Sequence, residues 1–283
     1  MTYDLTRVHE ANLYMLKEID RICKKYGINY MLDAGTLLGA VRHKGFIPWD
    51  DDADVAMTRE NYEKFARVAK KELPSDLEFL EPQVLGDGKA FYDFNVRVLY
   101  LNSRTRQDDS EMEYYSNKLT HLWVDIFILD ELPDSKLSRT LTLLGMKVIY
   151  GFAMGHRYSM DYSKYSLLLK CYVGVLATVG KCLPMKTIYR LQHSLSIKHN
   201  TGKNHCFYYT NYPPDYFYVT LNREWCDNII TLELEGEQFM CSAQWDDVLR
   251  WIYGDYRKLP PEEMRVPTHS NIEIEVGETG EKQ

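Results

Sequence analysis

The chain has 283 residues and is 45% hydrophobic and 27% charged, with a formal net charge of −7. It is long enough to bury one large core or two modest ones. The negative charge and the absence of a recognised binding motif exclude nucleic acid as an expected partner. The six cysteines form no Cys-x-x-Cys pair, so we expect reduced, structural thiols and neither a disulfide framework nor a zinc site.

The N-terminal segment predicts an amphipathic helix. Apolar residues recur every three to five positions from Leu5 to Tyr26, and Gly27 is suited to end the helix. The first residues lack the basic and apolar regions of a signal peptide. We therefore expect a cytoplasmic protein in which this helix is scaffold.

A short strand and a turn follow. Residues 30–32 predict a buried strand, and residues 37–41 a short helix. Between them, Gly35 allows backbone to approach a ligand, and Thr36 is suited to cap the helix. Because a helix N-terminus offers free N–H groups, this turn predicts a phosphate site. The Gly-Thr pair alone is a weak signal, since it opens many ordinary helices.

Four aspartates then stand within five residues, at positions 50, 51, 52 and 54, between the apolar Trp49 and Val55. Carboxylates this close repel one another, and a divalent cation relieves the repulsion. Oxygen ligands favour Mg²⁺ or Mn²⁺. Strand alternation places Asp52 and Asp54 on one face, where they can share a metal. The alternative is a solvated acidic loop, which the apolar neighbours disfavour.

Three cationic side chains, Arg42, His43 and Lys44, precede the acidic cluster. We expect them to pair with phosphate, with surface ion pairing to the same acids as the alternative. After the cluster, Thr58 predicts the start of a helix that Pro74 ends.

Residues 77–82 and 90–101 predict strands. In the second of them, Arg97 either reaches donor phosphates or points outward from a half-exposed strand.

A buried strand that carries an acid is predicted at residues 122–129. Its Asp125 is the expected third metal ligand, and the alternative is a strand-end acid that caps a backbone amide. We expect Asp130 to be only a cap or turn residue.

Residues 136–203 carry eleven Lys and Arg against a single acid, Asp161, a charge of +10 that leaves −17 for the rest of the chain. Their apolar runs at 141–150 and 167–179 predict helices that are too short to span a membrane. A basic, apolar helical insert suits attachment to an anionic membrane surface or binding of a lipid-linked glycan. The alternative is a buried helical subdomain with solvated lysines.

The last part begins with an aromatic loop at 207–217, which suits either stacking on a base or sugar or simple packing. A strand is predicted at 229–240 and a helix at 245–253, closed by Gly254. The expected division is a catalytic core (1–135), the basic insert (136–203), a segment that completes the core (204–269) and a flexible acidic tail (270–283).

Gly35-Thr36 followed by Asp52-Ala-Asp54-Val resembles the pattern of the nucleotidyltransferase superfamily. The longer string from Leu37 to Asp54 resembles the LicD family, which includes bacterial choline-phosphate transferases and the fukutin-related group. The resemblance continues at 123–130, 234–239 and 253–261, and Ile128 stands where the family commonly has proline.

The resemblance implies an α+β fold, a nucleotidyltransferase-like mixed sheet flanked by helices with the basic helical insert added. It implies a metal-dependent phosphotransferase in which Asp52, Asp54 and Asp125 hold Mg²⁺ (or Mn²⁺). The donor would be a CDP-alcohol such as CDP-choline, and Gly35 and Thr36 would seat its phosphates. A sugar hydroxyl of a surface glycan would attack, with Asp125 or Asp52 as base, and CMP would leave. The cysteines, the N-terminus and the basic insert add the expectation of a cytoplasmic enzyme, attached peripherally to the inner face of the membrane.

Three other functions use similar features. A nucleotidyltransferase would attack an NTP and release pyrophosphate. A glycosyltransferase with an Asp-x-Asp motif generally has a nucleotide-binding unit before it, and only about fifty residues precede the motif here. A non-catalytic binding module would have little need for all three acids.

Overall fold

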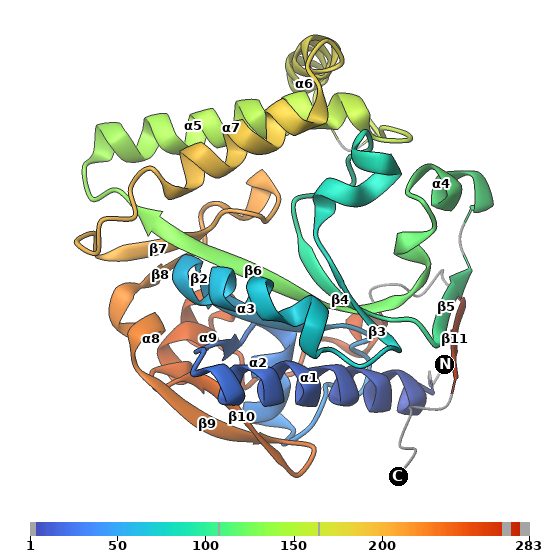
Figure 1. Ribbon diagram of the computed structural model, residues 1–283. Helices are drawn as coiled ribbons and strands as arrows, with labels where there is room; N and C mark the ends of the chain where they lie inside the picture. Colours follow the sequence, from blue (N-terminus) through green and yellow to red (C-terminus); the bar gives the residue numbers. More distant parts are fainter. Residues whose placement is uncertain (1–3, 107, 164, 268–272, 278–283) are drawn as a thin grey trace.

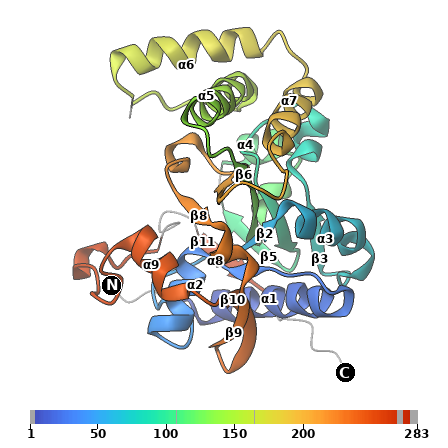
Figure 2. The ribbon, with the colours of Figure 1, turned by 90° about the vertical axis from the view of Figure 1, so that its left-hand side faces the viewer.

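A mixed β-sheet runs through the middle of the molecule, with helices on both sides (Figure 1). The structure is a computed structural model that describes residues 4–106, 108–163, 165–267 and 273–277. In both views, helix α1 (Thr6–Tyr26) lies at one end and helix α6 (Leu167–Gly180) at the opposite end (Figures 1 and 2). This arrangement confirms the expected α+β class.

The central sheet has one long strand, β6 (Leu122–Leu132), and three of the other strands pair with it directly. The other members are β1 (Met31–Leu32), β2 (Ala53–Thr58), β3 (Leu77–Leu80), β4 (Val96–Tyr100), β7 (Cys206–Tyr209) and β8 (Thr220–Asn222). The order is β1-β2-β6-β4-β3, and β2 runs parallel to β6. β4 and then β7 pair antiparallel with successive parts of β6, and β8 pairs with β7.

Helices α1, α2 (Ala34–Arg42) and α3 (Arg59–Glu72) pack with the sheet around the largest apolar core. The predicted end of α1 is confirmed, because Gly27 adopts a left-handed φ of 63° and its N–H bonds to the Cys23 carbonyl. The prediction that Thr36 caps α2 was wrong. Asp33 occupies the N-cap position, and Thr36 lies inside the first turn.

Two predicted strands are also corrected. Only Val96–Tyr100 of the segment 90–101 is a strand, because Phe91 and Phe94 turn into a second apolar core. The segment 229–240 is a hairpin of β9 (Ile229–Leu234) and β10 (Glu237–Ser242). Glu235 and Gly236 form its turn with φ values of 52° and 79°, a conformation that continuous strand pairing cannot contain.

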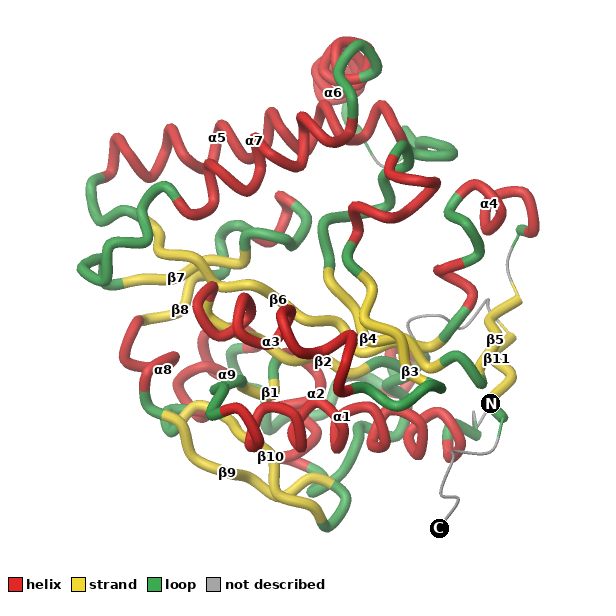
Figure 3. Tube along the Cα trace, in the orientation of Figure 1, coloured by secondary structure: helices red, strands yellow, loops and turns green. Residues whose placement is uncertain are grey.

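The insert is helical, as predicted. It consists of α5 (Lys136–Ala153), α6 and α7 (Met185–Ile197), and Figure 3 shows that the strands lie outside it. In the second core, the ring centroids of Tyr150 and Tyr189 lie 5.8 and 5.7 Å from that of Phe94. In the described residues, only α6 and α7 taken together have the length and composition of a membrane span, and they are bent by 114°.

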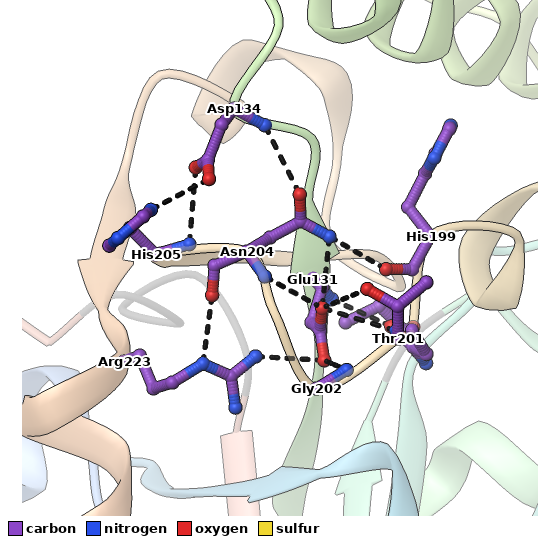
Figure 4. Close-up of polar contacts among 10 residues, drawn as sticks. Glu131, Asp134, His199, Thr201, Gly202, Asn204, His205 and Arg223 are labelled. Atoms are coloured by element: carbon purple, nitrogen blue, oxygen red, sulfur yellow. Dashed lines mark hydrogen bonds and ion pairs between the residues drawn. The ribbon is translucent and has the colours of Figure 1, made fainter.

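A polar network joins the two segments that connect the insert to the core, one where the chain enters the insert and one where it leaves (Figure 4). Glu131, at the end of β6, accepts hydrogen bonds from the amides of Thr201, Gly202 and Asn204 and pairs with Arg223 at 2.8 Å. Burial opposes its charge, but the bonds from Asn204, Gly202 and Arg223 outweigh burial and lower the Glu131 pKa to about 2. The insert is therefore fixed to the core.

Asp130 is not a simple cap or turn residue, contrary to the prediction. It is buried within β6, and its carboxylate accepts hydrogen bonds from Nε and one terminal nitrogen of the Arg59 guanidinium, at 2.9 and 2.6 Å. Thr210 and Asn200 complete its hydrogen bonds. The pair links α3 to β6, β7 and the end of the insert.

The C-terminal part contains α8 (Arg223–Asp227), α9 (Trp245–Tyr253) and a strand in the expected tail. β11 (Glu273–Val276) pairs with β5 (Ser103–Arg106), so a wholly flexible tail was wrong for these residues. The remainder of 270–283 lies outside the described residues, apart from Gly277. The short helix α4 (Asp109–Tyr114) begins with a side-chain cap from Asp108. Part of the predicted aromatic loop is strand β7.

We expect Asp130→Ala to lower the free energy of unfolding by about 3–5 kcal/mol, because it leaves Arg59 buried without its anion. Glu60→Ala is the matched control, since Glu60 pairs with Lys64 at 2.7 Å on the exposed side of the same helix. That change should stay within about 0.5 kcal/mol. Urea unfolding measures both, and similar losses would contradict the buried pair's role.

Candidate functional site

Three adjacent strands place the main site residues in one row across the sheet. Asp54 of β2 is the register partner of Asp125 of β6, and Asp125 is the partner of Arg97 of β4. Residues opposite one another in a sheet project from the same face. The row brings together two of the three predicted metal ligands.

Arg97 does not point outward. Its side chain is 2% exposed, and its guanidinium bonds to both Asp93 oxygens at 2.9 and 2.5 Å. Its Nε lies 3.1 Å from Asp125 Oδ1. The Trp123 indole N–H donates to the other Asp125 oxygen at 3.1 Å. Arg97 is therefore placed to hold Asp125 in position.

The turn before α2 lies beside this row. The Asp33 amide donates to the Asp54 carbonyl at 3.1 Å, and the Asp54 amide donates to the Thr36 hydroxyl at 2.8 Å. Thr36 is buried, so its hydroxyl fixes β2 against α2. Asp33 is also buried and accepts a hydrogen bond from Tyr209 at 3.0 Å.

Asp50, Asp51 and Asp52 gather just before β2. Each can offer a carboxylate oxygen within 4.8 Å of the others, which is the spacing of a group that can share a cation. The Asp50 carboxylate lies directly against Gly35, where any side chain would collide with it. Gly35, which was predicted to let the backbone approach a ligand, thus also leaves room for the Asp50 carboxylate.

Asp50, Asp54 and Asp125 hold their protons more tightly than usual. Burial, then the charge of Asp52, raises the pKa of Asp50 to about 8. Burial followed by the charges of Asp52 and Asp125 raises the Asp54 pKa well above its ordinary value. Burial also raises the Asp125 pKa to about 6, although Arg97 opposes it. The cluster has more negative charge than its surroundings compensate, which favours a bound cation.

A cavity of about 540 Å³ opens onto these acids. Asp50, Asp52 and Asp54 line it together with Gly35, at the start of α2. Aliphatic side chains such as Leu38, Ile47 and Met264 form part of the wall, and cationic and aromatic side chains form another part. The cationic and aromatic side chains include Arg42, Lys258, Trp49, Tyr212, Tyr253 and Tyr256.

The three predicted cations separate in space. Arg42 lines the cavity and donates to the Tyr256 carbonyl at 2.9 Å. The His43 ring meets Trp49 edge-on at 6.1 Å, and Lys44 is exposed with a φ of 58°. Among the described residues, Arg42 alone of the three lines the cavity.

Sequence reasoning did not select four residues that the fold brings to the site. Asp33 was visible as an acid between a strand and a helix, and Asp50 as part of the acidic run. Tyr253 and Lys258 lie about 200 residues later, in the segment 253–261 that takes part in the family resemblance, but the sequence gave neither of them a role in the site. Only the packing of α9 near α2 could reveal them.

A model of the LicD/FKTN/FKRP nucleotidyltransferase domain matches residues 27–140. The chain is 30% identical over 280 residues to the lipopolysaccharide cholinephosphotransferase LicD of Haemophilus influenzae, covering 93% of this chain and 96% of the relative. It is also 39% identical over 67 residues to an uncharacterised protein of Rickettsia typhi and 42% over 60 residues to one of Rickettsia prowazekii. Those matches cover 22% and 23% of the rickettsial proteins.

Asp50→Asn should stabilise the metal-free protein more at about pH 8 than at about pH 5. The Asp50 pKa is raised from 3.8 to about 8, so the folded state binds this proton more tightly than the unfolded state. The resulting stability is complete below about pH 4 and is lost as the pH rises through about 8. Thermal unfolding in EDTA at both pH values measures the difference. Asp227→Asn, at an exposed position outside the cavity, should show no such dependence, and an equal effect of Asp50→Asn at both pH values would contradict the assignment.

Proposed function

The chain belongs to the LicD family and is a LicD-type phosphotransferase; from this premise we propose that it moves phosphocholine from CDP-choline to a sugar hydroxyl of lipopolysaccharide or a similar surface glycan. The observation that carries the proposal is the row of Asp54, Asp125 and Arg97 beside a cavity whose wall is acidic, cationic and aromatic in different parts. The relative from Haemophilus influenzae supplies the choice of phosphocholine and lipopolysaccharide.

We propose Asp52, Asp54 and Asp125 as the residues that hold Mg²⁺ (or Mn²⁺), with Asp50 close by. The donor set fits such an ion, because it consists of carboxylate oxygens, and burial and nearby negative charge raise the pKa values of Asp50, Asp54 and Asp125. A bound ion would neutralise the donor's diphosphate and the leaving phosphate. Arg97 fixes the Asp125 carboxylate within this set.

In the proposed reaction, the acceptor hydroxyl oxygen attacks the phosphorus that bears choline. A new P–O bond forms, the bond from that phosphorus to the bridging oxygen breaks, and CMP leaves with the electron pair. The hydroxyl proton passes to a carboxylate. Asp52 is better placed for this role than Asp125, because Asp52 lines the cavity and Asp125 is held by Arg97 and Trp123.

The cavity wall suits the remaining parts of the donor. Arg42 and Lys258 would meet its phosphates, and the α2 N-terminus at Gly35 adds backbone N–H groups. Trp49 would meet the trimethylammonium group, because aromatic faces attract such cations. The Arg265 guanidinium lies 5.6 Å from the Trp49 ring centroid, which supports this choice because the ring already attracts a cation.

Asp54→Asn should reduce CMP formation from CDP-choline and a lipopolysaccharide acceptor by roughly a thousandfold, since it removes a proposed metal ligand. The metal-free variant should unfold at the same temperature as the wild type or slightly higher, because a repelling charge is lost. Chromatographic analysis of products decides the reaction, and Asp227→Asn is the control. Full activity of Asp54→Asn would refute the site, and pyrophosphate release from an NTP would identify a nucleotidyltransferase.

Trp49→Leu should weaken binding of CDP-choline roughly three- to thirtyfold, while binding of CDP, which lacks the choline group, changes little. Trp49→Phe retains an aromatic face and should lie in between. Titration calorimetry of both ligands gives the comparison. Equal weakening of CDP and CDP-choline by Trp49→Leu would place the choline group elsewhere.

A further inference from the structure

Helix α6 presents an apolar face to solvent. Leu167, Leu168 and Val175 are 77%, 84% and 64% exposed, and Tyr172 and Val179 are also exposed. The only charged residue in the helix is Lys170. A surface helix normally places polar residues on its outer face, so a helix that is apolar on both sides lacks a partner on one of them.

The opposite side of α6 is buried in the packing of the insert. Val173, Ala177 and Gly180 are buried against α5 and the residues that follow it. Backbone of Phe152 approaches Gly180 so closely that any side chain there would collide with it. The outer face therefore cannot turn inward without breaking this packing.

Neighbouring surfaces of the insert add further apolar groups and positive charge. Leu137, Leu141 and Leu144 are exposed on α5, and their spacing places them along one side of that helix. The insert carries a charge of +10, whereas the rest of the chain carries −17. Exposed cations include Lys147, Lys181, Lys186, Arg190 and Lys198.

We propose that the outer face of α6 docks onto the surface of an anionic lipid bilayer. The leucines and valines enter the interface between headgroups and acyl chains, and the cations of the insert attract the lipid phosphates. The charge asymmetry sets the orientation, because the acidic remainder of the molecule is repelled by the same surface. α6 lies at the end of the molecule opposite α1, so docking leaves the core in water (Figures 1 and 2).

The Glu131 network gives this attachment a consequence for the proposed function. It fixes both crossings between insert and core, so a docked α6 holds the catalytic cavity in a defined position relative to the membrane. A lipid-linked glycan acceptor would meet the site at that position. The docking itself rests on the α6 surface and does not depend on which donor the enzyme uses.

Flotation of the full chain with vesicles tests the proposal. Wild type should bind phosphatidylglycerol-containing vesicles at low salt, bind phosphatidylcholine vesicles weakly, and lose binding as salt rises. Leu168→Ser combined with Val175→Ser should weaken binding at least about tenfold. Ile230→Ser, at an exposed position of β9, is the matched control and should bind as wild type does.

Two further measurements keep the outcome decisive. The double variant should retain wild-type helix content by circular dichroism and wild-type affinity for CDP-choline, which separates docking from the donor site. Wild-type vesicle binding by the double variant, or no binding of wild type to anionic vesicles, would overturn the proposal. Dimerisation of wild type without vesicles that the double variant abolishes would assign the face to a second copy of the chain, and would also overturn it.

Discussion

Repulsion among the carboxylates at the start of β2 is the constraint on which the site depends. The parallel register of β2 and β6 places Asp54 beside Asp125, and the preceding loop adds Asp50 and Asp52. Several like charges in a partly buried space are unfavourable unless protons or a cation compensate them. The fold keeps the acids together despite this cost, which is the physical basis for assigning them a role with a divalent metal and a diphosphate.

The protein compensates part of this charge itself, and it does so unevenly. Arg97, itself paired with Asp93, holds one oxygen of Asp125, and Asp125 lies beside the cavity-lining Asp54 in the sheet. Asp50, Asp52 and Asp54 line the cavity, and burial and nearby negative charge raise the pKa values of Asp50 and Asp54. The elements behind them belong to the main core, whereas the basic insert has its own core around Phe91 and Phe94. The proposed chemistry and the proposed membrane attachment thus fall on separate parts of the molecule, which the Glu131 network joins.

The sequence predicted the features that depend on neighbouring residues. The helix from Leu5 to Tyr26, the strand that carries Asp125 and the helical insert follow from periodicity, and the structure confirms them. Of the predicted metal ligands, Asp54 and Asp125 are register partners and Asp52 groups with Asp50 and Asp51, while the role of all three stays a prediction. Features that depend on distant contacts were missed or wrong. Asp130 gave no sign of its partner Arg59, and Tyr253 and Lys258 reach the cavity only through packing of the C-terminal part. The hairpin turn at Glu235 was missed because Glu is unusual at a left-handed position.

The central claim is that the acidic cavity binds a CDP-alcohol together with a divalent metal. Thermal unfolding with CDP-choline, with and without Mg²⁺, tests it most directly in wild type and Asp52→Asn. A ligand at a hundredfold excess over its dissociation constant stabilises a protein by about 2.7 kcal/mol, which should raise the wild-type midpoint by several degrees. The account predicts a shift that requires the metal and is lost in Asp52→Asn. No shift in wild type, or the same shift without metal and in Asp52→Asn, would contradict it.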